Sequence, residues 1–275
     1  MAVPARPRTL AVVLILLPPS EGKTAPTSGA PVDLDALSFP QLTGDRVDMM
    51  AALVRLCREQ PDAAVRTLGL GPQQADDVAR NGALPHAPAA PARLIYSGVL
   101  HDALGLAELG GAAAARADSA LVLMSALWGA LRPSDTIPAY RLGGDVTLPG
   151  VGKVSTFWRS VLRTALPPTD DGLIVDLRSS TYAGFWRPDV DAASRTAAVR
   201  VLHEHDGKRT VVSHHNKATK GHIARRLLEL DNDPATPREL AELLSADGWS
   251  VESTPGPRPT TPTTVDVIVR HVPAR

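Results

Sequence analysis

The sequence predicts an α/β fold, in which a mixed sheet with flanking helices forms a single compact domain over residues 1–275. The first observation behind this prediction is that apolar runs of strand length alternate along the chain with amphipathic stretches of helical spacing. The second is that polar segments follow several predicted strands, where the loops of α/β sheets converge into a ligand crevice. A chain of 275 residues is ample for one large core.

Composition is that of an ordinary globular protein, with 44% hydrophobic and 21% charged residues. The formal net charge is zero, so attraction to nucleic acid requires a local basic patch. Cys57 is the single cysteine, which excludes a disulfide within the chain and is typical of a reducing compartment. We expect Cys57 to be packed in a helix, although an exposed thiol of low pKa could sense oxidant.

The apolar run Leu10–Leu17 follows two arginines and resembles the core of a signal peptide. It is short, however, and it ends in Pro18-Pro19 before a loop that carries Lys23. These features favour a buried strand of a parallel sheet. Since no stretch of the chain reaches the roughly 18 apolar residues of a membrane helix, we expect no membrane partner and a cytoplasmic location.

A helix-hairpin-helix-like segment is expected at about residues 49–82. The helix predicted for Arg46–Gln60 is followed by two short helices that flank Leu68-Gly69-Leu70-Gly71. Gly69 and Gly71 allow a tight turn whose backbone amides can hold a phosphate. Any short helical hairpin can use glycine in the same way, so the turn also fits a purely structural role.

The remaining elements alternate along the chain. We expect strands at residues 93–96, 120–125, 172–177, 197–205, 209–213 and 265–272. Helices are expected at residues 101–108, 156–164, 217–230 and 238–245. Residues 25–44 and 254–264, rich in Pro, Gly or Thr, are expected to be surface loops.

The first polar segment, residues 18–24, ends in Gly22-Lys23-Thr24 after a predicted strand, as a P-loop does. The first glycine of that motif is missing, which argues against an ATPase. Lys23 can still approach an anion, or it can be a solvated loop lysine.

The second segment, residues 124–142, carries Arg132, Asp135, Tyr140 and Arg141 in a loop stiffened by prolines. Two arginines can hold a planar anion through paired hydrogen bonds. The alternative is that Asp135 only orients Arg132 or Arg141 as a structural pair.

The third and fourth segments add hydroxyls and cations. Ser179 and Tyr182 follow a predicted strand and can donate to a phosphate or to a developing oxyanion, although the segment also resembles an ordinary helix cap. On the helix expected at 217–230, Lys217 and Lys220 share a face with His222 or Arg225. Residues 194–226 hold eight Lys or Arg against two acids, the strongest charge excess in the chain, which favours an anionic ligand. Their histidines lack the spacing of a metal site, so no metal is predicted.

Residues 124–142 resemble the signature of the YaaA family of bacterial peroxide-stress proteins. The shared residues are Ser125, Leu127, Gly129, Leu131, Arg132, Pro133, Asp135, Ile137, Tyr140, Arg141 and Leu142. Trp128 replaces the usual tyrosine, and Lys220 stands where the family usually has arginine. The resemblance extends over roughly residues 10–272, and the loop Ser20-Glu21-Gly22-Lys23 departs from the family's commoner Ser-Pro-Ala-Lys.

The resemblance implies a cytosolic protein that limits iron-driven oxidative damage and binds DNA through a basic cleft. Backbone amides near Gly69 and Gly71 would hold a phosphate, and Ser179 could donate to one. The cations that would line the cleft are Lys23, Arg132, Arg141, Lys217, Lys220 and Arg225.

The alternative is an enzyme that acts on a phosphorylated or nucleotide-like small molecule in the same cleft. Asp135, Tyr140 and Tyr182 are the candidate catalytic residues, and Glu21 is a second candidate base. Lys217 or Arg225 would then stabilise developing charge. No cofactor fingerprint is present in the sequence, so no cofactor is predicted. A closed pocket would favour this enzyme, whereas an open groove continuous with Gly69–Gly71 would favour nucleic acid.

Overall fold

The computed structural model describes residues 13–166, 172–205, 208–210, 213–230 and 232–270. Its centre is an eight-stranded sheet in the order β11-β12-β9-β8-β1-β3-β4, with β10 paired to β9. The strands are β1 Leu14–Leu17, β3 Leu121–Ser125, β4 Gly129–Leu131, β8 Ile174–Asp176, β9 Thr196–His205, β10 Lys208–Thr210, β11 Ser250–Thr254 and β12 Thr263–Val269. The five strands β3, β1, β8, β9 and β12 are parallel, and β4, β10 and β11 are antiparallel to their neighbours.

Strand β1 lies at the point where the strand order reverses. From β1 the chain first adds β3 on one side and later adds β8, β9 and β12 on the other. In open α/β sheets the loops that leave two such strands diverge, and a crevice forms at their carboxyl ends. The loops that begin at Pro18 after β1 and at Leu177 after β8 therefore open into the same space.

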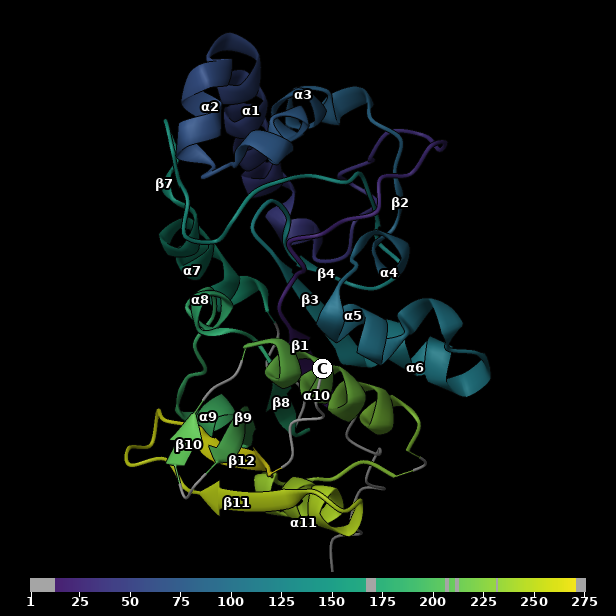
Figure 1. Ribbon diagram of the computed structural model, residues 1–275, viewed down its shortest axis with the longest axis vertical. Coiled ribbons are helices and arrows are strands. Elements are labelled where there is room, and N and C mark those ends of the chain that lie inside the picture. The colour runs from purple at the N-terminus through teal and green to yellow at the C-terminus, as the bar shows by residue number, and fades with distance from the viewer. Residues whose placement is uncertain (1–12, 167–171, 206–207, 211–212, 231, 271–275) are drawn as a thin grey trace, which may run out of the picture.

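The helices surround this sheet unevenly (Figure 1). The first three form a group at one end of the molecule, while α10 lies over the middle of the sheet and packs against α5 and α6. Their bounds are α1 Thr43–Glu59, α2 Pro61–Thr67, α3 Asp76–Gly82, α4 Ala92–Ile95, α5 Val99–Leu104, α6 Gly111–Ala120, α7 Val154–Ala165, α8 Ser180–Ala183, α9 Val190–Ser194, α10 Ser213–Leu228 and α11 Pro237–Ala246.

Short elements complete the chain. Four 3₁₀ turns are present in the described residues, at Pro40–Leu42, Pro72–Gln74, Leu84–His86 and Leu106–Glu108. Two small ribbons pair β2 (Ala90–Pro91) with β5 (Thr136–Ile137) and β6 (Thr147–Leu148) with β7 (Gly152–Lys153).

The central strands are buried on both faces. Every residue of β1 and β3 is buried, which is why these strands read as continuous apolar runs rather than alternating ones. Cys57 is buried in α1 as predicted, and burial raises the pKa of its thiol. The predicted fold class is confirmed, and the expected strands at residues 120–125, 172–177, 197–205 and 265–272 correspond to β3, β8, β9 and β12.

Several expectations for individual elements were wrong or incomplete. The strand expected at residues 209–213 is β10, which ends at Thr210, and Ser213 is already the first residue of α10. Residues 92–95 form the helical turn α4 instead of a strand, because Ala92 N and Arg93 N donate to carbonyls of the loop at residues 133–135. Helices α6, α8 and α9 and strands β4 and β11 had no expected counterpart. Residues 10–12 of the first expected strand lie outside the described part of the chain.

Candidate functional site

A cavity of about 1230 Å³ lies at the carboxyl ends of β1 and β8. All four polar segments singled out in the sequence contribute to its wall, through residues 18–23, 141–147, 176–183 and 216–220. The wall continues to residues 66–69 at the end of α2. Of the expected anion-binding residues, the cavity brings together Lys23, Gly69, Arg141, Ser179, Lys217 and Lys220.

The wall is basic, with seven Lys or Arg and three Asp or Glu side chains. Three of the cations are paired with carboxylates: Arg141 with Glu21 at 3.6 Å, Arg178 with Asp176 at 2.7 Å and Arg200 with Asp266 at 2.7 Å. Within the described residues the other four cations make no ion pair; they are Lys23, Arg66, Lys217 and Lys220. An anionic ligand would therefore meet cations that are not already neutralised.

Lys23 is held inside the wall by the loop that follows β1. Its Nζ donates to the carbonyl oxygen of Ser20 at 2.8 Å and lies 4.2 Å from the centre of the Tyr140 ring. A single antiparallel bridge to Tyr96 fixes the backbone of Lys23. Burial, followed by the nearby positive charge of Arg141, lowers the pKa of the Lys23 amine to about 7.

Behind Lys23 lies a buried chain of hydroxyl groups. The Tyr140 hydroxyl lies 2.7 Å from Ser125 Oγ and 3.1 Å from the Tyr96 hydroxyl. Burial raises the pKa of both tyrosines, so both phenols stay protonated. His101 stacks on the Tyr96 ring, and burial lowers the pKa of its imidazole to about 4, which leaves it neutral. This arrangement places polar but uncharged groups next to the Lys23 amine.

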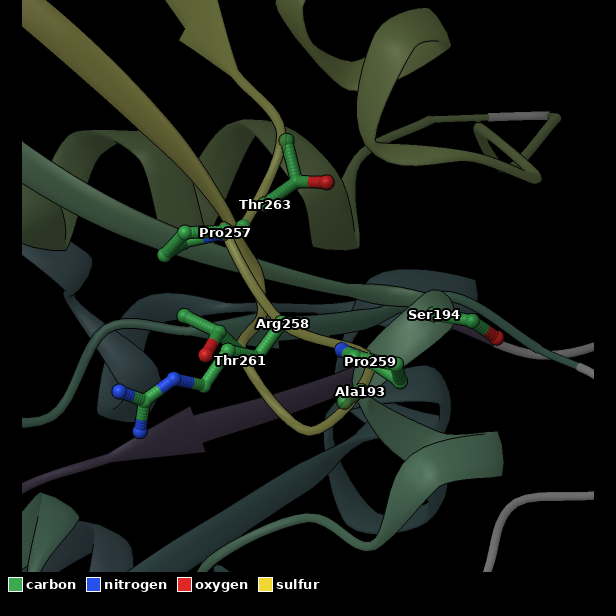
Figure 2. Close-up of a pocket in the computed structure, with 8 residues that line it drawn as sticks. Ala193, Ser194, Pro257, Arg258, Pro259, Thr261 and Thr263 are labelled. Carbon is green, nitrogen blue, oxygen red and sulfur yellow. The ribbon is translucent and has the colours of Figure 1, made fainter.

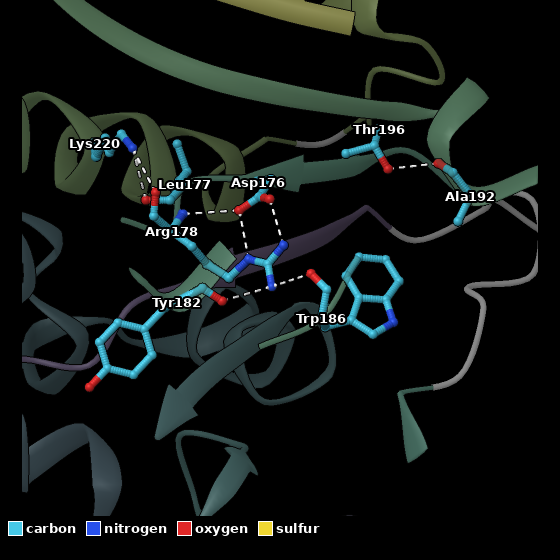
Figure 3. Close-up of polar contacts among 8 residues, drawn as sticks. All are labelled: Asp176, Leu177, Arg178, Tyr182, Trp186, Ala192, Thr196 and Lys220. Atoms are coloured by element: carbon cyan, nitrogen blue, oxygen red, sulfur yellow. Dashed lines mark hydrogen bonds and ion pairs between the residues drawn. The ribbon is translucent and has the colours of Figure 1, made fainter. Parts of the chain in front are cut away.

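The loop after β8 is fixed by a buried ion pair (Figure 3). Arg178 Nε and Nη2 each donate to the Asp176 carboxylate, at 2.8 and 2.7 Å, and Nη1 donates to the carbonyls of Tyr182 and Trp186. The charge of Arg178 keeps the pKa of Asp176 below its usual value although burial opposes this effect. Arg178 therefore positions the segment that carries Ser179 and Tyr182, both of which line the cavity.

Lys220 and Lys217 reach the cavity from the first turns of α10. Lys220 Nζ donates to the carbonyls of Leu177 and Arg178, each at 3.1 Å, and burial lowers the pKa of its amine to about 8. Lys217, one turn earlier, is exposed. A Cβ at Gly221 would lie 2.3 Å from the carbonyl oxygen of Leu100, so glycine is what allows α10 to touch α5 this closely.

Besides Gly71, four expected site residues lie outside the cavity wall. Arg132 donates to the carbonyls of Ser119 and Leu121. Asp135 accepts from the amides of Ser38 and Arg132 and from the Ser38 hydroxyl, which is the structural role considered as its alternative. The other two are Arg225, which pairs with Glu229 at 2.9 Å, and Tyr140, which touches the cavity only through Lys23.

The glycine turn between α2 and α3 uses its amides within the chain. Gly69 adopts a positive φ of 63°, and its amide donates to Arg66 O while the Leu70 amide donates to Val65 O. These bonds close the end of α2 as a Schellman motif does. The Gly71 amide donates to the Gln74 side chain. Since Gly71 does not line the cavity and these amides are already paired, a phosphate contact at Gly69 and Gly71 stays a prediction.

A second cavity, of about 330 Å³, lies near the starts of β9 and β12 (Figure 2). Its lining includes Arg258 as the only charged residue among the described ones, together with prolines, threonines and a serine. It is at the opposite end of the parallel strands from the larger cavity, away from the loops where α/β sheets bind ligands.

Comparison with known proteins decides the family. A family model described as peroxide stress protein YaaA matches residues 13–254. The chain belongs to the YaaA family. A UPF0246 protein of Streptomyces coelicolor is 46% identical over 94% of this chain and 100% of its own length, and one of Corynebacterium efficiens is 41% identical over 90% and 98%. A UPF0246 protein of Bacteroides thetaiotaomicron is 31% identical over 56% and 61%.

Several side chains that build the cleft of this YaaA family member were not singled out from the sequence. Arg46 is fully buried and donates to the carbonyls of Trp128, Ala130 and Ser38, which holds the signature segment in place. An arginine inside an amphipathic helix gives no such signal in a sequence. Arg66 and His101 also line the cavity; they lie in a segment and a helix that were expected from the sequence, but neither side chain was singled out as a site residue.

Two further findings concern the described residues as a whole. None of them forms a group of three or more His, Cys, Asp or Glu side chains placed to hold a metal ion. None of their helices has both the length and the apolar character needed to cross a membrane.

Proposed function

We propose that this YaaA family member protects against peroxide stress by binding DNA in the cleft at the carboxyl ends of β1 and β8, thereby limiting iron-driven damage. The observation that carries the proposal is the set of four cations without a carboxylate partner among the described residues. They come from three separate segments, with Lys23 after β1, Arg66 in α2, and Lys217 and Lys220 in α10. Phosphate contacts made by such cations dominate affinity for nucleic acid.

The extent of the cleft supports a polymeric ligand. Its wall runs from the end of α2, in the helical group at one end of the molecule, to α10 over the middle of the sheet (Figure 1). Its volume of about 1230 Å³ exceeds the ~300–1,000 Å³ of common small-molecule pockets. The zero net charge of the chain means that binding would depend on this local surface, and so on salt.

A second candidate function is an enzyme acting on a phosphorylated or nucleotide-like small molecule. Its support is the position of the cavity at the switch point of the sheet, together with a lysine whose pKa of about 7 suits proton transfer at neutral pH. Asp135 is less suited than expected to be the base, because its carboxylate accepts three hydrogen bonds away from the cavity. Tyr182 lines the cavity and stays a candidate.

Fluorescence anisotropy with labelled single-stranded, duplex and branched DNA across a salt series tests the first proposal. Replacing Lys217 by alanine should weaken binding to all sequences alike and reduce the slope of log affinity against log salt by about one. Lys153→Ala removes an exposed lysine of β7 outside the cavity and is the matched control. Absence of binding at low salt would overturn the DNA proposal and favour the small-molecule one.

A further inference from the structure

The environment of Lys23 differs from that of an ordinary binding lysine. In the described part of the chain its Nζ makes no ion pair; it donates to the Ser20 carbonyl at 2.8 Å and sits over the Tyr140 ring. The titratable groups around it are the carboxylates of Glu21 and Asp77, the cation Arg141, the phenols Tyr96 and Tyr140, and the imidazole of His101. Burial and Arg141 outweigh the two carboxylates, so the amine holds its proton weakly.

An amine of this kind is a nucleophile. A protonated lysine has no lone pair to attack with, whereas a lysine desolvated next to another cation keeps a substantial neutral fraction near pH 7. Burial and Arg141 lower the pKa of Lys23 to about 7, so the free amine is accessible near neutral pH. Carbonyl carbons are the electrophiles with which such lysines form imines.

Lys220 in the same wall has a different arrangement. Its Nζ donates to two backbone carbonyls, of Leu177 and Arg178, and so ties α10 to the loop after β8. Lys217 is exposed to solvent. Lys23 combines a lowered proton affinity with an Nζ placed 4.2 Å from the centre of the Tyr140 ring, and its carbonyl partners are Ser20 at 2.8 Å and Glu21 at 3.5 Å.

We propose that Lys23 forms an imine with the carbonyl carbon of a phosphate-bearing aldehyde held in the cleft. The amine nitrogen attacks the carbonyl carbon to form a C–N bond, and the carbonyl oxygen takes up a proton. The hydroxyl formed in this way takes up a second proton and leaves as water while the C=N bond forms. The nitrogen gives up both of its protons in the course of the reaction, and these balance the two that the water carries away. No oxidant or cofactor is needed, and water reverses the reaction. The phosphate of the ligand is held by the neighbouring cations, so this inference rests on the anion binding proposed above.

Two kinds of molecule carry both an aldehyde and a phosphate and could be this ligand. An abasic site in DNA opens to a sugar aldehyde flanked by phosphates, and a small sugar phosphate such as glyceraldehyde 3-phosphate carries the same two groups. Both place a carbonyl within a few bonds of a phosphate. A lysine inside a basic cleft can therefore react with the carbonyl while the neighbouring cations bind the phosphate.

Reductive trapping tests the inference on the full-length chain. The protein is incubated at pH 7 with sodium cyanoborohydride and either an oligonucleotide containing an abasic aldehyde or glyceraldehyde 3-phosphate. Hydride converts an imine into a stable secondary amine, which peptide mass spectrometry assigns to one of the five lysines of the chain. We expect the adduct at Lys23, and we expect Lys23→Arg, which keeps the charge, to lose it. Lys153→Arg, outside the cleft, should keep it.

The two arms and a binding control separate the outcomes. An adduct at Lys23 with either ligand supports the inference and identifies its source. Adducts spread over the lysines, or an equal yield from Lys23→Arg, would overturn it. An oligonucleotide with a tetrahydrofuran residue, which has no aldehyde, reports DNA binding alone. Binding of that oligonucleotide without any trapped adduct would reject the imine and leave the DNA proposal standing.

Discussion

The amine of Lys23 lies 4.2 Å from the centre of the Tyr140 ring, although the two residues come from loops more than a hundred positions apart. The contact joins the loop after β1 to the end of the signature segment. It also explains how a lysine without an ion pair among the described residues is accommodated. The face of the ring attracts the protonated amine, and it can accept a weak N–H contact from the neutral one. Substitutions of Lys23 and of Tyr140 test the two residues of this contact separately.

Lys23 should make the stability of the protein depend on pH. Its pKa is about 7 in the folded protein and 10.5 when unperturbed, so the unfolded chain binds the proton more tightly. The free energy of unfolding should therefore rise, relative to that of Lys23→Met, by about 3.5 kcal/mol as the pH increases from 7 to 10. Urea unfolding at both pH values measures this. An equal pH response of Lys23→Met and wild type would contradict it, and Lys153→Met is the matched control.

Tyr140→Phe should destabilise the protein by about 1–2 kcal/mol, because the Ser125 and Tyr96 hydroxyls lose a buried partner while the ring remains. A double-mutant cycle with Ser125→Ala, followed by chemical unfolding, measures the coupling directly. We expect the two changes to be less than additive. Strict additivity would mean that this hydrogen bond contributes nothing to stability.

Gly221→Ala should weaken the contact between α10 and α5. The added Cβ would lie 2.3 Å from the Leu100 carbonyl oxygen, so the helices must separate, at about 1–3 kcal/mol. The shift should also move Lys220 from the two carbonyls that it binds. Thermal unfolding measures the loss. Gly44→Ala in α1 is the control, because nothing lies within 4 Å of its Cβ position and alanine favours a helix by up to about 1 kcal/mol.

Arg178→Ala should cost about 3–5 kcal/mol, because it leaves the Asp176 carboxylate, whose side chain is only 13% exposed, without its arginine partner. Arg200→Ala removes a similar pair with Asp266, but the Arg200 side chain is 59% exposed, and we expect a loss of no more than about 1 kcal/mol. Chemical unfolding of both variants at pH 7 compares them. Similar losses would show that burial is not what makes the Arg178 pair important.

Much of the fold could be predicted because its signals are local. The apolar runs of β1 and β3 are buried on both faces, and this produces the uninterrupted hydrophobicity from which they were predicted. Residues 92–95 were mistaken for a strand because their helical turn depends on hydrogen bonds to residues 133–135, which no local pattern reveals. The alanine-rich helix α6 has too little contrast between its faces to stand out.

Some residues of the candidate site could also be predicted, because their position next to predicted strands and helices is visible in the sequence. Loops after strands carry ligand residues in this class of fold, and Lys23 and Ser179 were found from that rule. Lys220 was found from its position on an expected helix and from the charge excess of residues 194–226. Arg132 and Arg225 carry the same charge but turn to carbonyls and to Glu229 outside the cleft. Whether a side chain points into the cleft or away from it depends on tertiary packing. The spacing of residues in the sequence does not reveal this.

The cleft is assembled from residues near both ends of the chain, since Lys23 follows the first strand and Lys217 belongs to the tenth helix. During synthesis on the ribosome, β1 is flanked on both sides only after β3 and then β8 have been made. The wall of the cleft is therefore complete only after α10 has left the exit tunnel. Premature termination anywhere before that helix would release a polypeptide whose cleft lacks Lys217 and Lys220.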